Sequence, residues 1–449
     1  MFKKLMDKLP TAETEGTSSD SEKAEEEKKT TETVEIEAPL KASEDVILGL
    51  DIGTEFVKAV IAKQGKKGNL EVIGAGRERQ KGSNMHSGAI ADIPAVASTC
   101  EQALLAAEKM AGVRARATVV GVAGELIKGG TTTIRYRRKN GNKPLTEQEM
   151  NLIIKRVQSK TGERAKNEIA LETGNPDVEV RLINSAIVSL SIDGYKVSNP
   201  LGFKGSDLVI QFYTAYAPLV HISAIEKVCA ELELDLLAVA VEPFAVCRAC
   251  LGDDPDSSLS AIVMDIGGGT TDIAIVDDGG VEGTKMFSIG GRGFTNQIAT
   301  ALGVDFDTAE ELKVNPESIT DEKDAERIGE AIGESLGVWK AGVELAIEEF
   351  NPEDVLPTKI LLCGGGAGLL ELQEMLATSD WYEDLPFGRR PTIHLVASED
   401  IPGIVSKIDY DLDHSYTTAL GLLRVGLDTL AGVSETGSLK ERVAKLLEK

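Results

Sequence analysis

The sequence is poor in aromatic residues and in cysteine, and it contains no long apolar run. Aromatic side chains make up only 4% of the 449 residues, so its cores must be built mainly from Ala, Val, Ile and Leu. The five cysteines show no spacing typical of a disulfide framework, which favours a reducing compartment. No stretch reaches the roughly 18 apolar residues of a membrane-spanning helix. No apolar segment of a signal peptide follows the charged start of the chain.

Basic residues are also scarce relative to acidic ones. The net charge of −25 argues against a nucleic-acid-binding protein, which needs a basic surface. Much of this charge is local, because residues 11–45 hold 12 acidic residues against 4 lysines and few large apolar side chains. Such a segment cannot bury enough apolar surface to fold, so we expect a disordered acidic linker there.

Both ends of the chain carry a short amphipathic pattern. In residues 1–10, apolar side chains recur at helical spacing opposite three lysines, as in helices that lie in a membrane interface. The alternative is a frayed terminus or a peptide that binds a protein groove. Residues 431–449 hold a second pattern of this kind without aromatic side chains, and packing of that helix on the protein is an equal alternative.

Two glycine-rich segments, residues 46–61 and 264–276, share one pattern. Each has an apolar run, an aspartate, a turn with glycine and threonine, and a second apolar run. Strand, tight glycine turn and strand predict a β-hairpin whose backbone N–H groups can approach a phosphate closely. Asp265 and Asp272, which flank the second turn, fit a metal ion beside that phosphate better than a bare anion, and Asp51 is the matching aspartate of the first segment. Two such hairpins indicate two related lobes that face one nucleotide.

A third glycine run, 364–366, follows an apolar strand expected at 359–363 and precedes a helix. It lacks the G-x-G-x-x-G pattern of a dinucleotide-binding turn, so we interpret it as a third element facing the same nucleotide. Glu242, before Pro243 at a strand end, could orient a water for attack on a γ-phosphate. The alternative for Glu242 is an acid that stabilises a helix N-terminus. The four histidines are scattered, and we assign them no chemistry.

These motifs resemble those of the actin-like ATPase superfamily. Residues 51–54 resemble its phosphate-1 motif, residues 265–271 its phosphate-2 motif, and residues 364–367 its adenosine motif. Finer features are similar to the bacterial cell-division family FtsA, among them 192–205, which resembles the end of its inserted SHS2 subdomain. Further FtsA-like segments are 242–245, 290–313 and 416–422.

The resemblance implies an α/β, two-lobed actin-like ATPase fold with an inserted SHS2 subdomain and a disordered acidic N-terminal extension. The expected parts are an amphipathic membrane helix at 1–10, the linker at 11–45, lobe I at 46–114 and 215–258, the SHS2 subdomain at 115–214, lobe II at 259–430 and a C-terminal tail at 431–449.

The resemblance also implies ATP and Mg as cofactors and a set of residues that hold them. Asp51 and Asp265 would hold Mg through water, and Glu242 would position water if ATP is hydrolysed. The residues expected to contact the phosphates are Gly53, Thr54, Lys58, Gly267, Gly268, Gly269, Thr270 and Thr271. Those expected to hold the nucleoside are Glu310, Lys313, Gly364, Gly365 and Gly366.

By this resemblance we expect a cytoplasmic, ATP-binding cell-division protein on the inner face of the cell membrane, with slow or absent ATPase activity. It would polymerise, bind the C-terminal peptide of FtsZ, tether FtsZ filaments to the membrane and recruit other divisome proteins. The few residues between Lys313 and the helix expected at 325–350 depart from FtsA and are more similar to PilM. The alternative hypothesis is therefore that the protein is a scaffold of a type IV pilus assembly platform. A third hypothesis is a kinase or chaperone of the superfamily.

Overall fold

The computed structural model describes most of the chain that follows the acidic segment. The described residues are 40–65, 69–197, 199–251, 259–350 and 355–431. The two terminal helices and most of the acidic linker predicted from the sequence lie outside them. Among the described residues, no helix is both long enough and apolar enough to cross a membrane.

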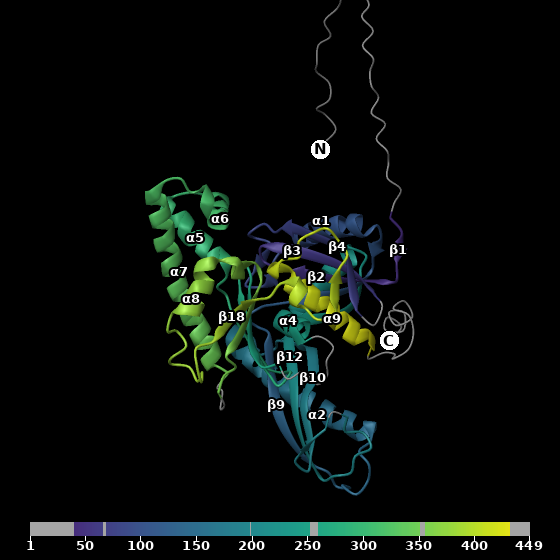
Figure 1. Cartoon of the computed structure of the whole chain (residues 1–449). Coiled ribbons are helices and arrows are strands. Elements are labelled where there is room, and N and C mark those ends of the chain that lie inside the picture. Colours follow the sequence, from purple (N-terminus) through teal and green to yellow (C-terminus); the bar gives the residue numbers. More distant parts are fainter. Residues whose placement is uncertain (1–39, 66–68, 198, 252–258, 351–354, 432–449) are drawn as a thin grey trace, which may run out of the picture. The chain divides into compact units, whose positions relative to one another are not determined.

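The first lobe is built on a six-stranded sheet with the order β13-β8-β2-β3-β4-β19 (Figure 1). Its β2 and β3 form the first predicted hairpin, in which Asp51 pairs with Lys58 close to the turn. The strands are β2 (Val46–Ile52), β3 (Phe56–Gln64), β4 (Leu70–Arg79), β8 (Ala117–Val122), β13 (Asp235–Val241) and β19 (Ile404–Ser406). Two further sheets are two-stranded: β1 (Ala42–Ser43) with β7 (Arg114–Ala115), and β5 (Met85–His86) with β6 (Ala89–Ile90).

The second lobe holds five strands of a nine-stranded sheet with the order β11-β10-β12-β9-β16-β15-β14-β17-β18. Its β14 and β15 form the second predicted hairpin. Parallel pairing of β17 with β14 sets Cys363 opposite Asp265, so the glycine run that follows β17 lies beside this hairpin. The five strands are β14 (Ala261–Ile266), β15 (Thr271–Asp277), β16 (Gly280–Phe287), β17 (Lys359–Cys363) and β18 (Thr392–Leu395).

The two faces of β14 differ in side-chain size, and each face packs in a different core with different helices. Ala261 and Val263 join the core that contains α4 and α9, and their small side chains let α4 approach the strand closely. Ile262, Met264 and Ile266 join a second core with α5 and α7. The helices of the first core are α1 (Ile93–Ala111), α3 (Leu219–Glu231), α4 (Glu242–Leu251) and α9 (Thr417–Ala431). Those of the second lobe are α5 (Gly291–Leu302), α6 (Phe306–Val314), α7 (Glu322–Glu348) and α8 (Leu370–Thr378).

The region predicted to hold the SHS2 subdomain forms an antiparallel sheet covered by one helix. The helix buries Met150, Ile153 and Val157 against the strands in a third, separate core. The guanidinium of Arg138 ties the sheet to this helix, since its NH2 donates to the Glu149 carboxylate at 2.8 Å. The elements are β9 (Lys128–Arg137), α2 (Glu147–Thr173), β10 (Val180–Ile192), β11 (Tyr195–Lys196) and β12 (Asp207–Pro218).

Two strands lie in a different sheet from the one that the predicted boundaries imply. β8, placed in the SHS2 subdomain by the boundary at residue 115, pairs in parallel with β2 and β13 in the first lobe. β19, within the stretch assigned to lobe II, pairs with β4 of the first lobe. An apolar run identifies a strand but not its partner, and long-range pairing decided both cases.

The inserted subdomain is connected to the second lobe through the sheet itself. β9 pairs with β16, with Gly130 opposite Gly283 and Gly129 opposite Thr284. The subdomain follows the first lobe in the sequence, yet its sheet continues that of the second lobe (Figure 1).

Candidate functional site

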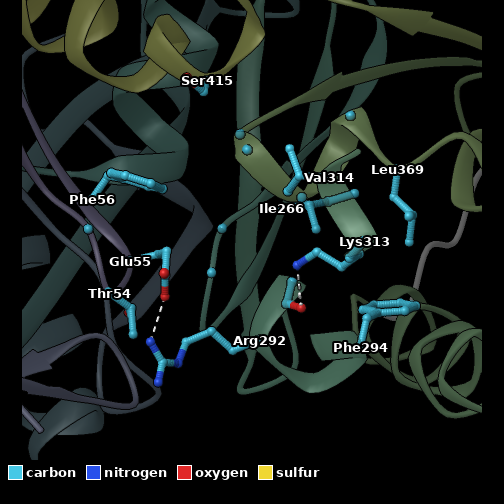
Figure 2. A pocket seen from close by; sticks show the side chains of 18 of the residues that line it. Thr54, Glu55, Phe56, Ile266, Arg292, Phe294, Lys313, Val314, Leu369 and Ser415 are labelled. Carbon is cyan, nitrogen blue, oxygen red and sulfur yellow. Dashed lines mark hydrogen bonds and ion pairs between the residues drawn. The ribbon is translucent and has the colours of Figure 1, made fainter. Parts of the chain in front are cut away.

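A cavity of about 660 Å³ lies between the two glycine-rich hairpins, and residues of both lobes line it (Figure 2). Small-molecule sites in proteins measure roughly 300–1,000 Å³. Thr54 and Phe56 approach it from the first lobe, and Phe294, Lys313 and Leu369 from the second (Figure 2). The cavity is therefore large enough for a nucleotide and is bordered by the elements expected to hold one.

The turns of the two hairpins touch each other, and glycine permits this contact. A Cβ atom on Gly268 would lie 2.6 Å from the Cβ of Glu55. A Cβ atom on Gly269 would lie 2.9 Å from the Cγ2 of Thr54. Larger residues in the second turn would therefore push the two lobes apart at this point.

The third glycine run closes on the second hairpin. Gly364 has a φ of +81°, a left-handed conformation that favours glycine. A Cβ atom there would lie 2.2 Å from the Oδ1 of Asp265 and 2.5 Å from the carbonyl oxygen of Ile266. The exposed Gly365 and the half-buried Gly366 follow directly and border the cavity.

Asp51 and Asp265 lie on opposite hairpins and share the cation of Lys58. The Lys58 Nζ donates to Asp51 Oδ2 at 3.0 Å. Burial alone would lower the pKa of Lys58, but the charges of Asp51 and Asp265 outweigh it and raise that pKa. Burial raises the pKa of Asp265, partly offset by the Thr418 hydroxyl, which donates to its Oδ2 at 2.5 Å.

Glu242 and Asp272 add two more carboxyl groups to this cluster. Burial raises the pKa of Glu242 well above its ordinary value, and the charges of Asp51, Asp272 and Asp265 raise it further. Burial and the charge of Asp265 do the same to Asp272. Four carboxyl groups close enough to affect one another's pKa, with one lysine paired to Asp51, make a site that favours a bound cation.

These carboxyl groups do not form a direct metal cage. Among the described residues, no three His, Cys, Asp or Glu side chains converge closely enough to hold a metal ion. Mg²⁺ usually keeps several of its waters and is held by one or two carboxylates together with phosphate oxygens. The arrangement therefore fits a hydrated Mg²⁺ that arrives with a nucleotide.

The second-lobe end of the cavity combines one polar cluster with apolar walls. The Lys313 Nζ donates to the Gly291 carbonyl at 3.1 Å, to the Thr295 hydroxyl at 2.7 Å and to the Glu310 carboxylate at 2.8 Å. The apolar walls come from α5, α6, α7 and the loop before α8. They include Phe294, Leu312, Ile328, Ile332 and Leu369. Apolar walls beside a few polar groups suit a base with its attached sugar.

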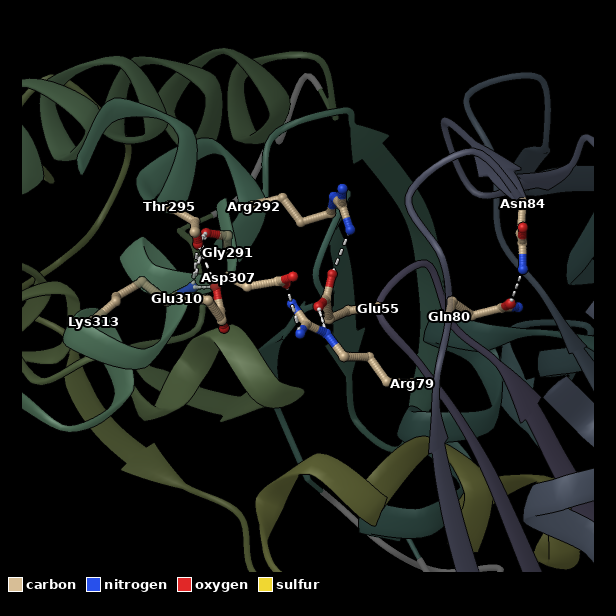
Figure 3. Close-up of polar contacts among 10 residues, drawn as sticks. All are labelled: Glu55, Arg79, Gln80, Asn84, Gly291, Arg292, Thr295, Asp307, Glu310 and Lys313. Carbon is tan, nitrogen blue, oxygen red and sulfur yellow. Dashed lines mark hydrogen bonds and ion pairs between the residues drawn. The ribbon is translucent and has the colours of Figure 1, made fainter. Parts of the chain in front are cut away.

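An ion-pair network joins the two lobes at the edge of the cavity (Figure 3). The Glu55 carboxylate accepts from Arg79 Nε at 2.7 Å and from Arg292 NH1 at 2.5 Å. Arg79 also pairs with Asp307 at 2.9 Å. Arg292 lies over the Phe306 ring, 4.6 Å from its centroid. None of these five residues was identified from the sequence, since no local pattern links positions so far apart.

Comparison with known proteins identifies relatives for most of the chain. Residues 262–447 match the family model described as cell division protein FtsA. FtsA of Pseudomonas aeruginosa is 27% identical over 408 residues, which cover 85% of this chain and 89% of that protein. FtsA of Neisseria meningitidis is 24% identical over 425 residues, which cover 88% and 93%. The chain resembles FtsA over most of its length.

A solved structure shows the same fold. The PilM–PilN type IV pilus biogenesis complex contains a chain that superposes with a TM-score of 0.62 at 20% identity. The match covers 85% of this chain and 98% of that one. Together with the FtsA resemblance, it confirms the predicted fold class, a two-lobed actin-like α/β fold.

Most residues of the predicted FtsA-like motifs border the cavity. They are Asp51, Gly53, Thr54, Lys58, Glu242, Asp265, Gly267, Gly268, Thr270, Glu310, Lys313, Gly364, Gly365 and Gly366. Gly269 and Thr271 lie outside the lining. Gly269 packs on Thr54, and the buried Thr271 hydroxyl donates to the Ile289 carbonyl at 2.7 Å and accepts from the Trp339 indole at 2.9 Å.

Proposed function

We propose that this chain is an ATP-binding, actin-like protein of the bacterial cell-division machinery. The observation that carries the proposal is the cavity at which two phosphate-type hairpins and a glycine turn meet, in a chain that resembles FtsA. Nucleotide bound between the lobes would favour one closure of the lobes, and thereby one assembly state of the protein.

Each part of the cavity has one task in this proposal. The backbone N–H groups of the turns at Gly53 and Gly267–Thr270 bind phosphate oxygens, and Lys58 neutralises their charge. Asp51 and Asp265 hold the waters of Mg²⁺, which when bound would offset the negative charge of the phosphates. Glu310, Lys313 and the turn 364–366 hold the nucleoside.

Glu242 is the group proposed to orient a water for slow hydrolysis. Its raised pKa favours the protonated form in the absence of a cation. A bound Mg²⁺ would favour its ionised form, which can accept a proton from water. Turnover would therefore depend on the cation as well as on ATP.

Replacement of Asp265 tests the nucleotide site. We expect Asp265→Ala to weaken Mg-ATP binding by about 10–100-fold, as for other groups that hold metal-bound waters. Asp277→Ala is the matched control, because Asp277 is an exposed carboxylate on the same hairpin, where it accepts from Ser260. Calorimetry with Mg-ATP measures both variants, and unchanged affinity of Asp265→Ala would reject the site.

The division role predicts a specific peptide partner. We propose that the protein polymerises and tethers FtsZ filaments to the membrane, and the resemblance to FtsA supports this role. The chain should retain the C-terminal peptide of FtsZ in a pull-down, in preference to a scrambled peptide of the same composition. Equal retention of the two peptides would count against the division role.

The likeness to PilM supports a second candidate function, a scaffold of a type IV pilus platform. That role predicts binding of the N-terminal peptide of an inner-membrane pilus protein instead of the FtsZ peptide. Both peptides can be compared in one competition experiment.

Attachment to the membrane is proposed to use a terminal amphipathic segment at the inner face of the cell membrane. We expect deletion of residues 1–10 to reduce co-sedimentation with anionic liposomes more than deletion of residues 437–449, because the first segment is basic and carries an aromatic residue. One short helix binds weakly, so stable attachment needs the avidity of a filament. Liposome binding that survives the first deletion would refute this assignment.

A further inference from the structure

His221 lies in the first turn of α3 and has one buried ring nitrogen. Among the described residues, nothing forms a hydrogen bond with its Nδ1. Burial lowers the pKa of this imidazole and so favours its neutral form. A neutral ring with its proton on Nε2 presents Nδ1 as a hydrogen-bond acceptor. Buried polar atoms are almost always paired, so a donor from outside the chain is expected at this nitrogen.

A small cavity separates His221 from Glu242. Its volume is about 10 Å³, which is room for one water molecule. Both side chains line it, and Glu242 also lines the large nucleotide cavity. The other residues that border both cavities, Ile52, Gly88 and Ala123, carry no ionisable group. Glu242 is therefore the polar link between the two cavities.

We infer that His221 positions the Glu242 carboxyl group through one water molecule held in the small cavity. In the absence of a bound cation the Glu242 O–H donates to the water, and the water donates to His221 Nδ1. His221 Nδ1 thereby gains the donor that the described residues do not supply.

The backbone beside the cavity leaves space for this arrangement. A Cβ atom on Gly121 would lie 3.0 Å from the Cγ and 3.1 Å from the Oε1 of Glu242. A Cβ atom on Gly124 would lie 3.8 Å from His221 Nδ1. Glycine at both positions lets the two side chains extend towards the small cavity.

The consequence for the site is a fixed carboxyl orientation. With one oxygen held by the water, the other oxygen of Glu242 is directed to the nucleotide cavity. This role rests on the proposed nucleotide site, because only there would an oriented carboxyl group act on a reactant. The water bridge itself does not depend on nucleotide and can be measured without it.

Histidine NMR of the full chain tests the bridge. The chain has four histidines, so ¹⁵N-histidine labelling gives few signals, and His221→Gln assigns the one of interest. We expect the Nε2–H form in the wild type and loss of the hydrogen-bonded Nδ1 shift in Glu242→Ala. Glu242→Gln should retain that shift, since its amide N–H can donate to the same water. Glu226→Gln should leave it unchanged, because Glu226 on the same helix pairs with the exposed Arg181.

Two outcomes overturn the inference: an unchanged His221 signal in Glu242→Ala, or an equal change in Glu226→Gln. If Glu242→Ala does not fold, Gly121→Ala replaces it, because its methyl group would lie 3.0–3.1 Å from Glu242 Cγ and Oε1, forces that side chain to shift and should change the His221 signal. Mg-ATP affinity is measured in parallel on wild type and His221→Gln. Absence of binding in both would reject the nucleotide site, whereas the NMR result alone decides the bridge.

Discussion

Removal of the Arg292 side chain should loosen the contact between the two lobes. Arg292 is the second-lobe donor to Glu55, and the pair is largely shielded, with side-chain exposures of 23% and 10%. A hydrogen bond to a charged group contributes about 1.5–3 kcal/mol. The contact with the Phe306 ring lies within the second lobe, so its loss does not change the contact between the lobes. Arg79 remains on Glu55 in the variant, so that carboxylate is not left unpaired.

The bond to Glu55 places the cost of Arg292→Ala at about 2 kcal/mol of closed-state stability, near the lower end of the range. Such a cost raises the population with separated turns by about 30-fold. Hydrogen–deuterium exchange of the turn peptides around residues 53–55 and 267–269 measures this change, because the two turns shield each other when the lobes touch.

Arg164→Ala is the control for this experiment. Arg164 pairs with Glu168 within one exposed helix of the inserted subdomain and touches neither turn. Exposed pairs of this kind contribute only about 0.3–0.5 kcal/mol. Exchange in the turn peptides that is equally slow in Arg292→Ala and in the wild type would show that the ion pair does not hold the lobes together.

Four further substitutions have defined outcomes. Asp272→Asn should raise the free energy of unfolding at neutral pH, because burial raises the folded-state pKa of Asp272 and ionisation therefore favours the unfolded chain. This gain should fade as the pH falls towards about 4, where the carboxyl group of the unfolded chain also takes up its proton. Urea unfolding of the variant and the wild type at pH 8 and at pH 5 measures the change in this gain. Gly268→Ala should lower the free energy of unfolding by about 1–3 kcal/mol, because the added methyl group overpacks against the first hairpin. Gly337→Ala in α7 should raise it by about 0.5–1 kcal/mol, because a Cβ atom there meets nothing within 4 Å. Trp339→Phe removes the donor to Thr271 and should cost about 1–3 kcal/mol in the same unfolding assay, and no loss would show that this bond adds nothing.

The hairpins and the third glycine run could be predicted from the sequence because their chemistry is local. An apolar run, an aspartate and a glycine turn are adjacent in the chain, and backbone geometry alone brings Asp51 and Lys58 together. The residues at the nucleoside end of the cavity could not be predicted from local spacing. Glu310 and Lys313 were predicted from the resemblance to FtsA. The hydrogen bonds of Lys313 to Glu310, Thr295 and Gly291 could not be predicted from the spacing of these residues in the sequence.

Features that depend on long-range packing were not predictable in this way. The strand β8 was placed in the wrong part of the fold because its partners, β2 and β13, are distant in the sequence. Glu55 and Arg292 form a pair across 237 positions, and neither lies in a pattern that suggests the other. His221 was given no chemistry, since only the folded chain brings it beside Glu242.

The continuous sheet between the second lobe and the inserted subdomain has a mechanical consequence. Two residue pairs between β9 and β16 hold the subdomain in register with the second lobe, although the chain enters and leaves it from the first lobe. A rotation of the second lobe on nucleotide binding would therefore rotate the inserted subdomain together with that lobe. The end of the subdomain that lies farthest from the β9–β16 pairing would move farther than the hairpins that caused the rotation. A small change at the phosphates would in this way become a large displacement at a surface open to other proteins.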